Sequence, residues 1–145
     1  MWTLEYSRRT TASPERIWAW YQDHESAPEW DPLVGRIQPD GPIAVGVTGR
    51  NTPPTGPSVP FVYTEVTPLV SYTEVSRVPG GSMAFTHDLR QDGDETVVTH
   101  GVRCEGAMSG VYRLVLRPSY KRGMEEALDG LIQRAEEGPP PVRDV

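Results

Sequence analysis

The clearest hydrophobic pattern in the chain covers residues 108–137. Apolar residues there recur mostly three or four positions apart, which is the spacing of one face of an α-helix. They are Met108, Val111, Leu114, Val115, Met124, Leu128, Leu131, Ile132 and Ala135. The pattern predicts one long amphipathic helix whose apolar stripe is buried against other elements. Pro118 lies inside it and predicts a kink or break near Leu114, because proline lacks a backbone donor.

Most of the chain before this helix alternates apolar and polar residues with a period of two, which is typical of half-buried strands. The predicted strands are residues 2–7, 33–38, 43–50, 61–67, 70–77, 82–91 and 95–105. One interruption is Ser13-Pro14-Glu15, which supplies an N-cap, a proline at the first helical position and an acid in the first turn. It predicts a short helix that ends near Asp23, followed by an irregular link over residues 24–32.

The composition fits one domain that can bury a core of its own. The chain has 145 residues, 37% of them hydrophobic, and a net charge of −6. The acidic balance argues against nucleic acid and against an anionic membrane surface as partners, and no basic cluster is longer than two residues. We expect a single domain over residues 1–138 and a disordered tail over residues 139–145.

The same sequence predicts a soluble cytoplasmic protein. A single cysteine, Cys104, excludes an intrachain disulfide and is compatible with a reducing compartment. No apolar run is long enough to span a bilayer, so we expect no membrane insertion, and the N-terminus is not a signal peptide.

Three short motifs, in this order along nearly the whole chain, resemble a known superfamily. They are Ser13-Pro14-Glu15-Arg16-Ile17-Trp18, Pro28-Glu29-Trp30-Asp31-Pro32 and Glu65-Val66-Thr67-Pro68. The resemblance is to the START-like (SRPBCC) superfamily, which includes polyketide cyclase/dehydrase-type proteins and the birch pollen allergen group. It implies an α+β helix-grip fold: a curved antiparallel sheet of about six to seven strands wrapped around the long C-terminal helix, with a short helix after the first strand.

The resemblance also implies a function. In this superfamily a cavity between sheet and helix takes small hydrophobic molecules, aromatic, polyketide-like or lipid-like, so we expect such a ligand here. Two alternatives remain open. One is a polyketide cyclase/aromatase-like enzyme that uses acid/base residues of the cavity, and the other is a co-chaperone-like protein-interaction module.

His87 and His100 are the candidate catalytic residues. The alternation of side chains along the two strands places both histidines on the same face of the sheet as their apolar neighbours. A hairpin tip at residues 92–95 would set them opposite or diagonal to each other. In a mostly apolar cavity they would supply polar contacts or a general acid/base near neutral pH. The alternative is that they hydrogen-bond within the sheet or reach solvent.

The hairpin of residues 61–77 leaves open which face points inward. If Thr67 pairs with Val70, Tyr63 faces Glu74, and Glu65 faces Tyr72. This face with Phe61 either is exposed, where it would be compatible with a homodimer, or lines the cavity.

The full set of expected ligand contacts follows from the resemblance and the strand parity. It is Trp30, Tyr63, Tyr72, Met83, Phe85, His87, His100, Tyr112, Met124 and Leu128. No motif with metal-ligand spacing, nucleophile elbow or glycine-rich phosphate loop occurs, so we expect no metal and no cofactor.

Overall fold

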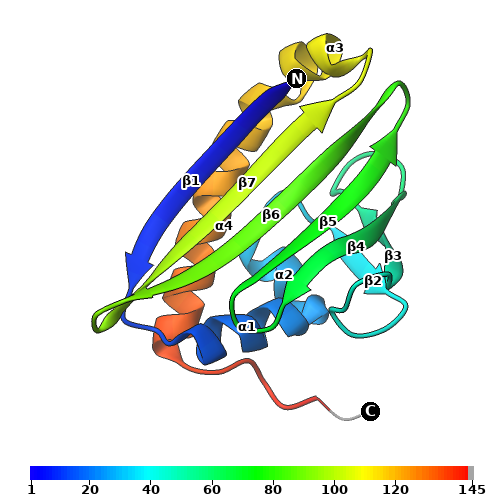
Figure 1. Cartoon of the computed structure of the whole chain (residues 1–145). Helices are drawn as coiled ribbons and strands as arrows, with labels where there is room; N and C mark the ends of the chain where they lie inside the picture. Colours follow the sequence, from blue (N-terminus) through cyan, green and yellow to red (C-terminus); the bar gives the residue numbers. More distant parts are fainter. Residues whose placement is uncertain (144–145) are drawn as a thin grey trace.

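Seven strands form one antiparallel sheet in the order β1-β7-β6-β5-β4-β3-β2 (Figure 1). The computed structural model describes residues 1–143. The strands are β1 (Trp2–Thr10), β2 (Arg36–Pro39), β3 (Thr48–Thr52), β4 (Val59–Thr67), β5 (Ser71–Val78), β6 (Gly81–Asp92) and β7 (Glu95–Glu105). Because β1 pairs with β7, the first and last strands lie side by side, as in the helix-grip arrangement predicted from the sequence.

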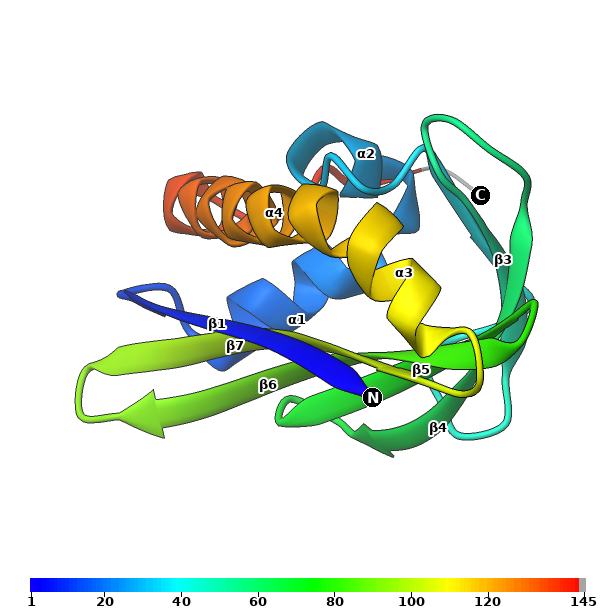
Figure 2. The same ribbon diagram turned by 90° about the horizontal axis from the view of Figure 1, so that it is seen from above.

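The helices lie on one side of this sheet. They are α1 (Pro14–Gln22), the 3₁₀ turn η1 (His24–Ser26), α2 (Ala27–Trp30), α3 (Ser109–Val115) and α4 (Arg117–Glu137). Figure 2 shows the sheet curving around them, with β3 standing beside the helical layer. The predicted α+β fold is confirmed.

Local sequence signals explain why α1 begins where it does. The side chain of Ser13 accepts a hydrogen bond from the backbone N–H of Arg16 (3.2 Å), and Pro14 occupies the first turn. The helix buries Ile17, Trp18 and Tyr21 against the sheet. The link after it is less irregular than predicted, because η1 and α2 add two short helical turns.

The C-terminal helix is broken into two. Leu116 separates α3 from α4, so the break predicted near Leu114 is confirmed within two residues. The prediction of one continuous buried stripe is wrong for the first segment: Met108, Val111, Leu114 and Val115 are all exposed. The break rotates this segment, so that Tyr112, Leu116 and Tyr120 pack inward instead; they are partly buried against a hydrophobic cluster.

A β-bulge sets the register of the β4–β5 hairpin. Tyr63 pairs with Glu74 as predicted, but the register shifts at Thr64, so Val66 rather than Glu65 pairs with Tyr72. The extra residue turns Glu65 to solvent while Tyr63 and Tyr72 both remain buried. The tyrosine face therefore points inward, and the exposed tyrosine surface that would have been compatible with a homodimer is not present.

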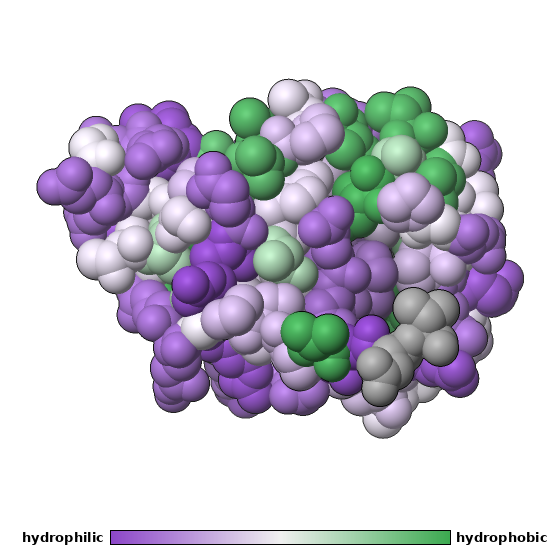
Figure 3. Space-filling view, turned by 90° about the horizontal axis from the view of Figure 1, so that it is seen from below, coloured by the Kyte–Doolittle hydropathy of each residue, from purple (hydrophilic) through white to green (hydrophobic). Residues whose placement is uncertain are grey.

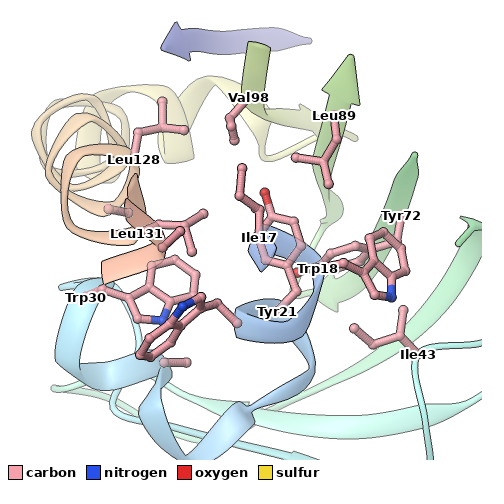
Figure 4. Packing of buried hydrophobic residues seen from close by; sticks show 14 of the residues in the cluster. Ile17, Trp18, Tyr21, Trp30, Ile43, Tyr72, Leu89, Val98, Leu128 and Leu131 are labelled. Atoms are coloured by element: carbon pink, nitrogen blue, oxygen red, sulfur yellow. The ribbon is translucent and has the colours of Figure 1, made fainter. Parts of the chain in front are cut away.

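Two adjoining hydrophobic clusters fill the space between helices and sheet. In the larger one Leu128 and Leu131 of α4 face Val98 and Ile17 and are fully buried (Figure 4). The aromatic rings of Trp18, Tyr21 and Tyr72 meet edge to face in the same cluster: Trp18 is 5.8 Å and Tyr21 5.2 Å from the Tyr72 ring centroid. The smaller cluster lies beneath α3 and includes Trp2, Met83 and Met124.

The chain beyond α4 returns toward α1. Arg143 forms ion pairs with Asp23 (2.6 Å) and Glu25 (3.0 Å), while residues 144–145 of the predicted tail lie outside the described residues. The single domain over residues 1–138 and the disorder of the tail stay predictions. Within residues 1–143, no helix combines the length and apolar content needed to cross a membrane.

Candidate functional site

A small, partly enclosed cavity lies between the sheet, α4 and the segment after α2. Its volume is about 80 Å³. The lining comes from six parts of the chain: Asp31, Leu33 and Val34 after α2, Asn51 of β3, Glu74 of β5, Phe85, Thr86 and His87 of β6, His100 and Gly101 of β7, and Tyr120, Met124 and Ala127 of α4. Apolar side chains and titratable groups therefore share one space.

His87 and His100 stand directly opposite each other on β6 and β7, as the hairpin tip predicted. Their ring centroids are 5.0 Å apart. The ring of His87 stacks on Tyr72 with 3.9 Å between centroids and 8° between planes, and its Nδ1 donates to the carbonyl oxygen of Tyr72 (3.3 Å). A neutral His87 in this arrangement presents Nε2 as an acceptor.

Tyr21 of α1 holds the second histidine. Its hydroxyl group lies 2.7 Å from Nε2 of His100, and both groups are buried. Burial, together with the neighbouring His87, holds the pKa of His100 well below its ordinary value. Burial lowers the pKa of His87 to about 4. Both imidazoles are therefore neutral near pH 7 and are poor proton donors.

Two carboxyl groups face the same cavity, and both titrate far above their ordinary range. Burial, and secondarily the negative charge of Asp31, raises the pKa of Glu74 to about 7. Burial raises the pKa of Asp31 to about 6, although the backbone N–H of Leu33 donates to this carboxyl group (2.9 Å) and opposes the shift. Within the described residues neither group has a salt-bridge partner, and Glu74 is the one poised to exchange a proton near neutral pH.

Two buried polar atoms near the cavity have no hydrogen-bond partner among the described residues. They are Oδ1 of Asn51, an acceptor on the lining, and Nε1 of Trp30, a donor in the adjoining core. A buried polar atom without a partner costs about 1–3 kcal/mol, so Oδ1 of Asn51 is available to accept a hydrogen bond from a ligand or water in the cavity.

The structure brings part of the predicted contact set to the cavity and places the rest in the surrounding core. Phe85, His87, His100 and Met124 are on the lining. The other residues, which are not on the lining, are Trp30, Tyr63, Tyr72, Met83, Tyr112 and Leu128. Tyr72 nevertheless reaches the site through its stacking on His87, whereas Tyr112 lies at the far end of the sheet and donates to the carbonyl of Pro79 (2.6 Å).

Five polar lining residues were absent from the predicted contact set: Asp31, Asn51, Glu74, Thr86 and Tyr120. Asp31 had a usable signal, because it follows Trp30 in the motif that carries the superfamily resemblance. The sequence placed Glu74 correctly opposite Tyr63. It left open whether that face of the hairpin is exposed or buried. Asn51 had no signal, since it lies at the edge of a proline-rich loop.

The histidines and acids of the cavity do not form a metal site of ordinary composition. Among residues 1–143 no group of three or more His, Cys, Asp or Glu side chains is arranged to hold a metal ion.

The sequence matches the family model described as "Polyketide cyclase / dehydrase and lipid transport" over residues 1–136. The chain belongs to this family. None of the curated proteins searched matches it significantly. Membership explains the order of its elements, and in this family the fold commonly binds hydrophobic ligands.

Solved structures of several other proteins share its fold. Ara h 8.0201 is 11% identical, with a TM-score of 0.73 over 94% of this chain and 99% of that one. Norcoclaurine synthase from Thalictrum flavum, in complex with dopamine and hydroxybenzaldehyde, is 13% identical, with a TM-score of 0.70 over 97% and 89%. TTHA0849 from Thermus thermophilus is 18% identical, with a TM-score of 0.69 over 92% and 96%. At these identities the likeness concerns the fold alone.

Proposed function

We propose that this protein binds a small molecule with an apolar body and a polar end in the cavity between sheet and α4. The observation that carries the proposal is the divided lining of that cavity. Leu33, Val34, Phe85 and Met124 supply apolar contact, which gives most of the affinity in sites of this kind. The titratable groups supply the few polar contacts that fix orientation.

The polar end of the ligand carries a hydrogen-bond donor, such as a hydroxyl or an ammonium group. Among the described residues, Oδ1 of Asn51 lacks a donor and the carboxyl group of Glu74 has no salt bridge, while Nε2 of His87 is an acceptor in the neutral ring. A ligand donor would satisfy atoms that are costly to leave unpaired in a buried site. A carboxylate ligand is disfavoured because Glu74 and Asp31 would repel it.

The size of the cavity limits what part of a ligand fits inside. About 80 Å³ is well below the roughly 300–1,000 Å³ of sites that enclose drug-sized molecules. The bulky rings of Trp18, Tyr21, Tyr63 and Tyr72 occupy the neighbouring space. The cavity therefore suits a compact molecule, or one end of a longer molecule.

Native mass spectrometry of the purified protein tests for a co-purified molecule, and methyl NMR tests binding directly. We expect phenol and benzylamine to shift the methyl signals of Met124 and Ala127, and benzoate to leave them unchanged. Ala127→Leu should abolish the response by filling the cavity. Ala135→Leu is the matched control, because Ala135 is buried on the same helix but outside the lining.

If no probe shifts these signals and no molecule co-purifies, the binding proposal is wrong. A response that survives Ala127→Leu would place the binding site elsewhere. A response to benzoate as strong as to phenol would overturn the requirement for a donor.

A second candidate function is acid/base catalysis on a ligand held in the same cavity. The observation that favours it is Glu74, whose pKa of about 7 matches that of an efficient proton-transfer group at neutral pH. The histidines are the weaker candidates because both are neutral there. Turnover of candidate polyketide or carbonyl substrates should fall at least about 100-fold in Glu74→Gln, with exposed Glu65→Gln as control. If Glu74→Gln turns over substrate as fast as the wild-type protein, the catalytic hypothesis is wrong, while the binding proposal is unaffected.

A further inference from the structure

The outer side of α3 and the first turn of α4 combine exposed apolar and basic side chains. We call this surface the α3 patch; its residues are Val111, Arg113, Leu114, Val115, Arg117 and Lys121. Figure 1 shows that α3 lies at one end of the molecule. On it Leu114 is 81% exposed and Val115 64% exposed, so large apolar groups are in contact with water. An apolar surface of this kind marks an interaction site more often than a single exposed residue does.

The opposite side of the same segment fixes its orientation. Tyr112 and Leu116 pack into the smaller core cluster, and the hydroxyl of Tyr112 donates to the carbonyl of Pro79 (2.6 Å). Turning the helix to bury Leu114 would expose these groups and break that bond. The α3 patch is therefore held outward by the fold.

The charge around the α3 patch is opposite to that of the whole chain. Residues 106–124 contain Arg113, Arg117, Lys121 and Arg122 and no acid, while the chain carries a net charge of −6. Among the described residues no salt bridge involves these four side chains. The preceding acid, Glu105, is already paired with Arg103 at 3.2 Å. The cations are free to meet an anionic partner.

Apolar exposure alone does not single out this surface. Val45, Leu69 and Val70 are also exposed, and the face in Figure 3 shows apolar residues among mostly hydrophilic ones. The α3 patch differs in having apolar side chains framed by cations. A hollow on it is lined by Gly110, Leu114 and Pro118 together with the cationic side chains of Arg113, Arg117 and Lys121.

We propose that the α3 patch docks the protein on a lipid bilayer that carries anionic head groups. Leu114, Val115 and Val111 would enter the head-group boundary, where an amphipathic helix lies in the plane of the membrane. Arg113, Arg117 and Lys121 would meet lipid phosphates and carboxylates, each contributing attraction that salt screens. α3 has 7 residues, so the contact is peripheral and reversible.

Charge complementarity favours a membrane over a second copy of this chain. In a two-fold symmetric dimer the same surface meets itself, and Arg113, Arg117 and Lys121 would face their own counterparts. An anionic bilayer neutralises them instead. This inference does not depend on the cavity ligand, because none of the α3 patch residues lines the cavity.

Vesicle co-sedimentation tests the proposal with the full chain. We expect binding to phosphatidylcholine vesicles that contain phosphatidylserine, weak binding to pure phosphatidylcholine, and loss of binding as salt is raised. The double variant Leu114→Gln, Val115→Gln should bind at least about tenfold more weakly. Arg117→Glu with Lys121→Glu should lose the preference for phosphatidylserine.

The matched controls change exposed residues at the β4–β5 turn and on β6. Leu69→Gln with Val70→Gln, and Arg90→Glu, should leave vesicle binding unchanged, because these residues lie away from the α3 patch. The proposal is overturned if the wild-type protein ignores phosphatidylserine vesicles or if the patch variants bind as well as the controls. It is also overturned if analytical ultracentrifugation shows a wild-type dimer that Leu114→Gln converts to a monomer, since a second copy of the chain would then cover the α3 patch.

Discussion

Burial shifts the pKa values of the four titratable groups of the cavity in the direction that favours their neutral forms. Glu74 and Asp31 keep their protons to higher pH than usual, whereas His87 and His100 lose theirs at lower pH than usual. A neutral form avoids the desolvation cost of a buried charge, and each group retains a hydrogen-bonding role. Single substitutions at this level separate the contributions of charge and of hydrogen bonding.

Replacing Glu74 with Gln should stabilise the protein in a pH-dependent way. Because the pKa of Glu74 is about 7 when folded and 4.5 ordinarily, the folded chain holds this proton more tightly, and stability falls as pH rises between these values. Glu74→Gln removes that loss. Its gain in unfolding free energy should be near zero at pH 4 and reach about 3 kcal/mol by pH 8.

Urea denaturation at several pH values checks this prediction, and Glu65→Gln on the exposed side of the hairpin is the control. A gain in stability that does not change with pH would show that the pKa of Glu74 is not raised by burial in the folded protein.

Tyr21→Phe should destabilise the protein by about 1–3 kcal/mol, because it leaves Nε2 of His100 buried without its 2.7 Å partner. Tyr120→Phe is a matched control near the same cavity: its hydroxyl reaches Sδ of Met83 at 4.0 Å, a weak contact. It should cost less than about 1 kcal/mol. Equal losses in the two variants, measured by chemical denaturation, would contradict a special role for the Tyr21–His100 bond.

At the scale of elements, glycines determine how closely α4 approaches the segment that carries Asp31. A Cβ on Gly130 would lie 2.9 Å from the carbonyl oxygen of Trp30, and one on Gly123 would lie 2.6 Å from the side chain of Leu33. Helix propensity alone predicts that both residues weaken α4. Their absent side chains let α2 and the following residues dock on the helix and place Asp31 on the cavity.

The pair Gly130→Ala and Gly110→Ala separates these two effects. Alanine at Gly110 meets open space in α3 and should stabilise by about 0.5–1 kcal/mol through helix propensity. Alanine at Gly130 meets a backbone carbonyl and should destabilise by at least about 1 kcal/mol. Thermal and urea denaturation measure both, and a stabilised Gly130→Ala would show that α2 does not pack closely against α4.

The sequence predicted elements better than their junctions. The β6–β7 hairpin and the capped start of α1 were correct because local residues such as Ser13 and Gly93 specify them. The bulge at Thr64 and the outward turn of Leu114 were not predictable, because both follow from what the neighbouring elements bury. The candidate site was half predicted: parity placed His87 and His100 together, but Asn51 and Asp31 reach the cavity through long-range packing.

At the scale of the whole molecule, the sheet is unevenly supported. β7 lies between β1 and β6, and its residues Val98, Val102 and Cys104 are almost fully buried. β2 has four residues at the sheet edge and pairs with β3 alone. The order of the elements along the chain, indicated by the family motifs, was enough to predict this architecture. The modest volume of the cavity was not predictable, because it depends on how aromatic side chains fill the interior.

Native-state hydrogen exchange should reflect this difference between the buried strand β7 and the edge strand β2. Amides of β7 should exchange through global unfolding, whereas those of β2 should exchange through local opening with a free energy lower by at least about 2 kcal/mol. Mass-spectrometric exchange across a urea series checks it, with urea strongly affecting β7 and barely affecting β2. Equal protection of both strands would mean that the sheet opens as one unit.

The mixed acid–histidine cavity has a consequence for the exchange of protons during folding. Around pH 5 to 6 the unfolded chain holds protons on the two imidazoles and not on the two carboxylates, whose ordinary pKa values are 3.8 and 4.5. In the folded chain Glu74 and much of Asp31 are protonated in this range, whereas His87 and His100 are not. Folding thus moves protons from the two imidazoles to the two carboxylates, and the opposite shifts largely offset one another in the pH dependence of stability between pH 5 and 6.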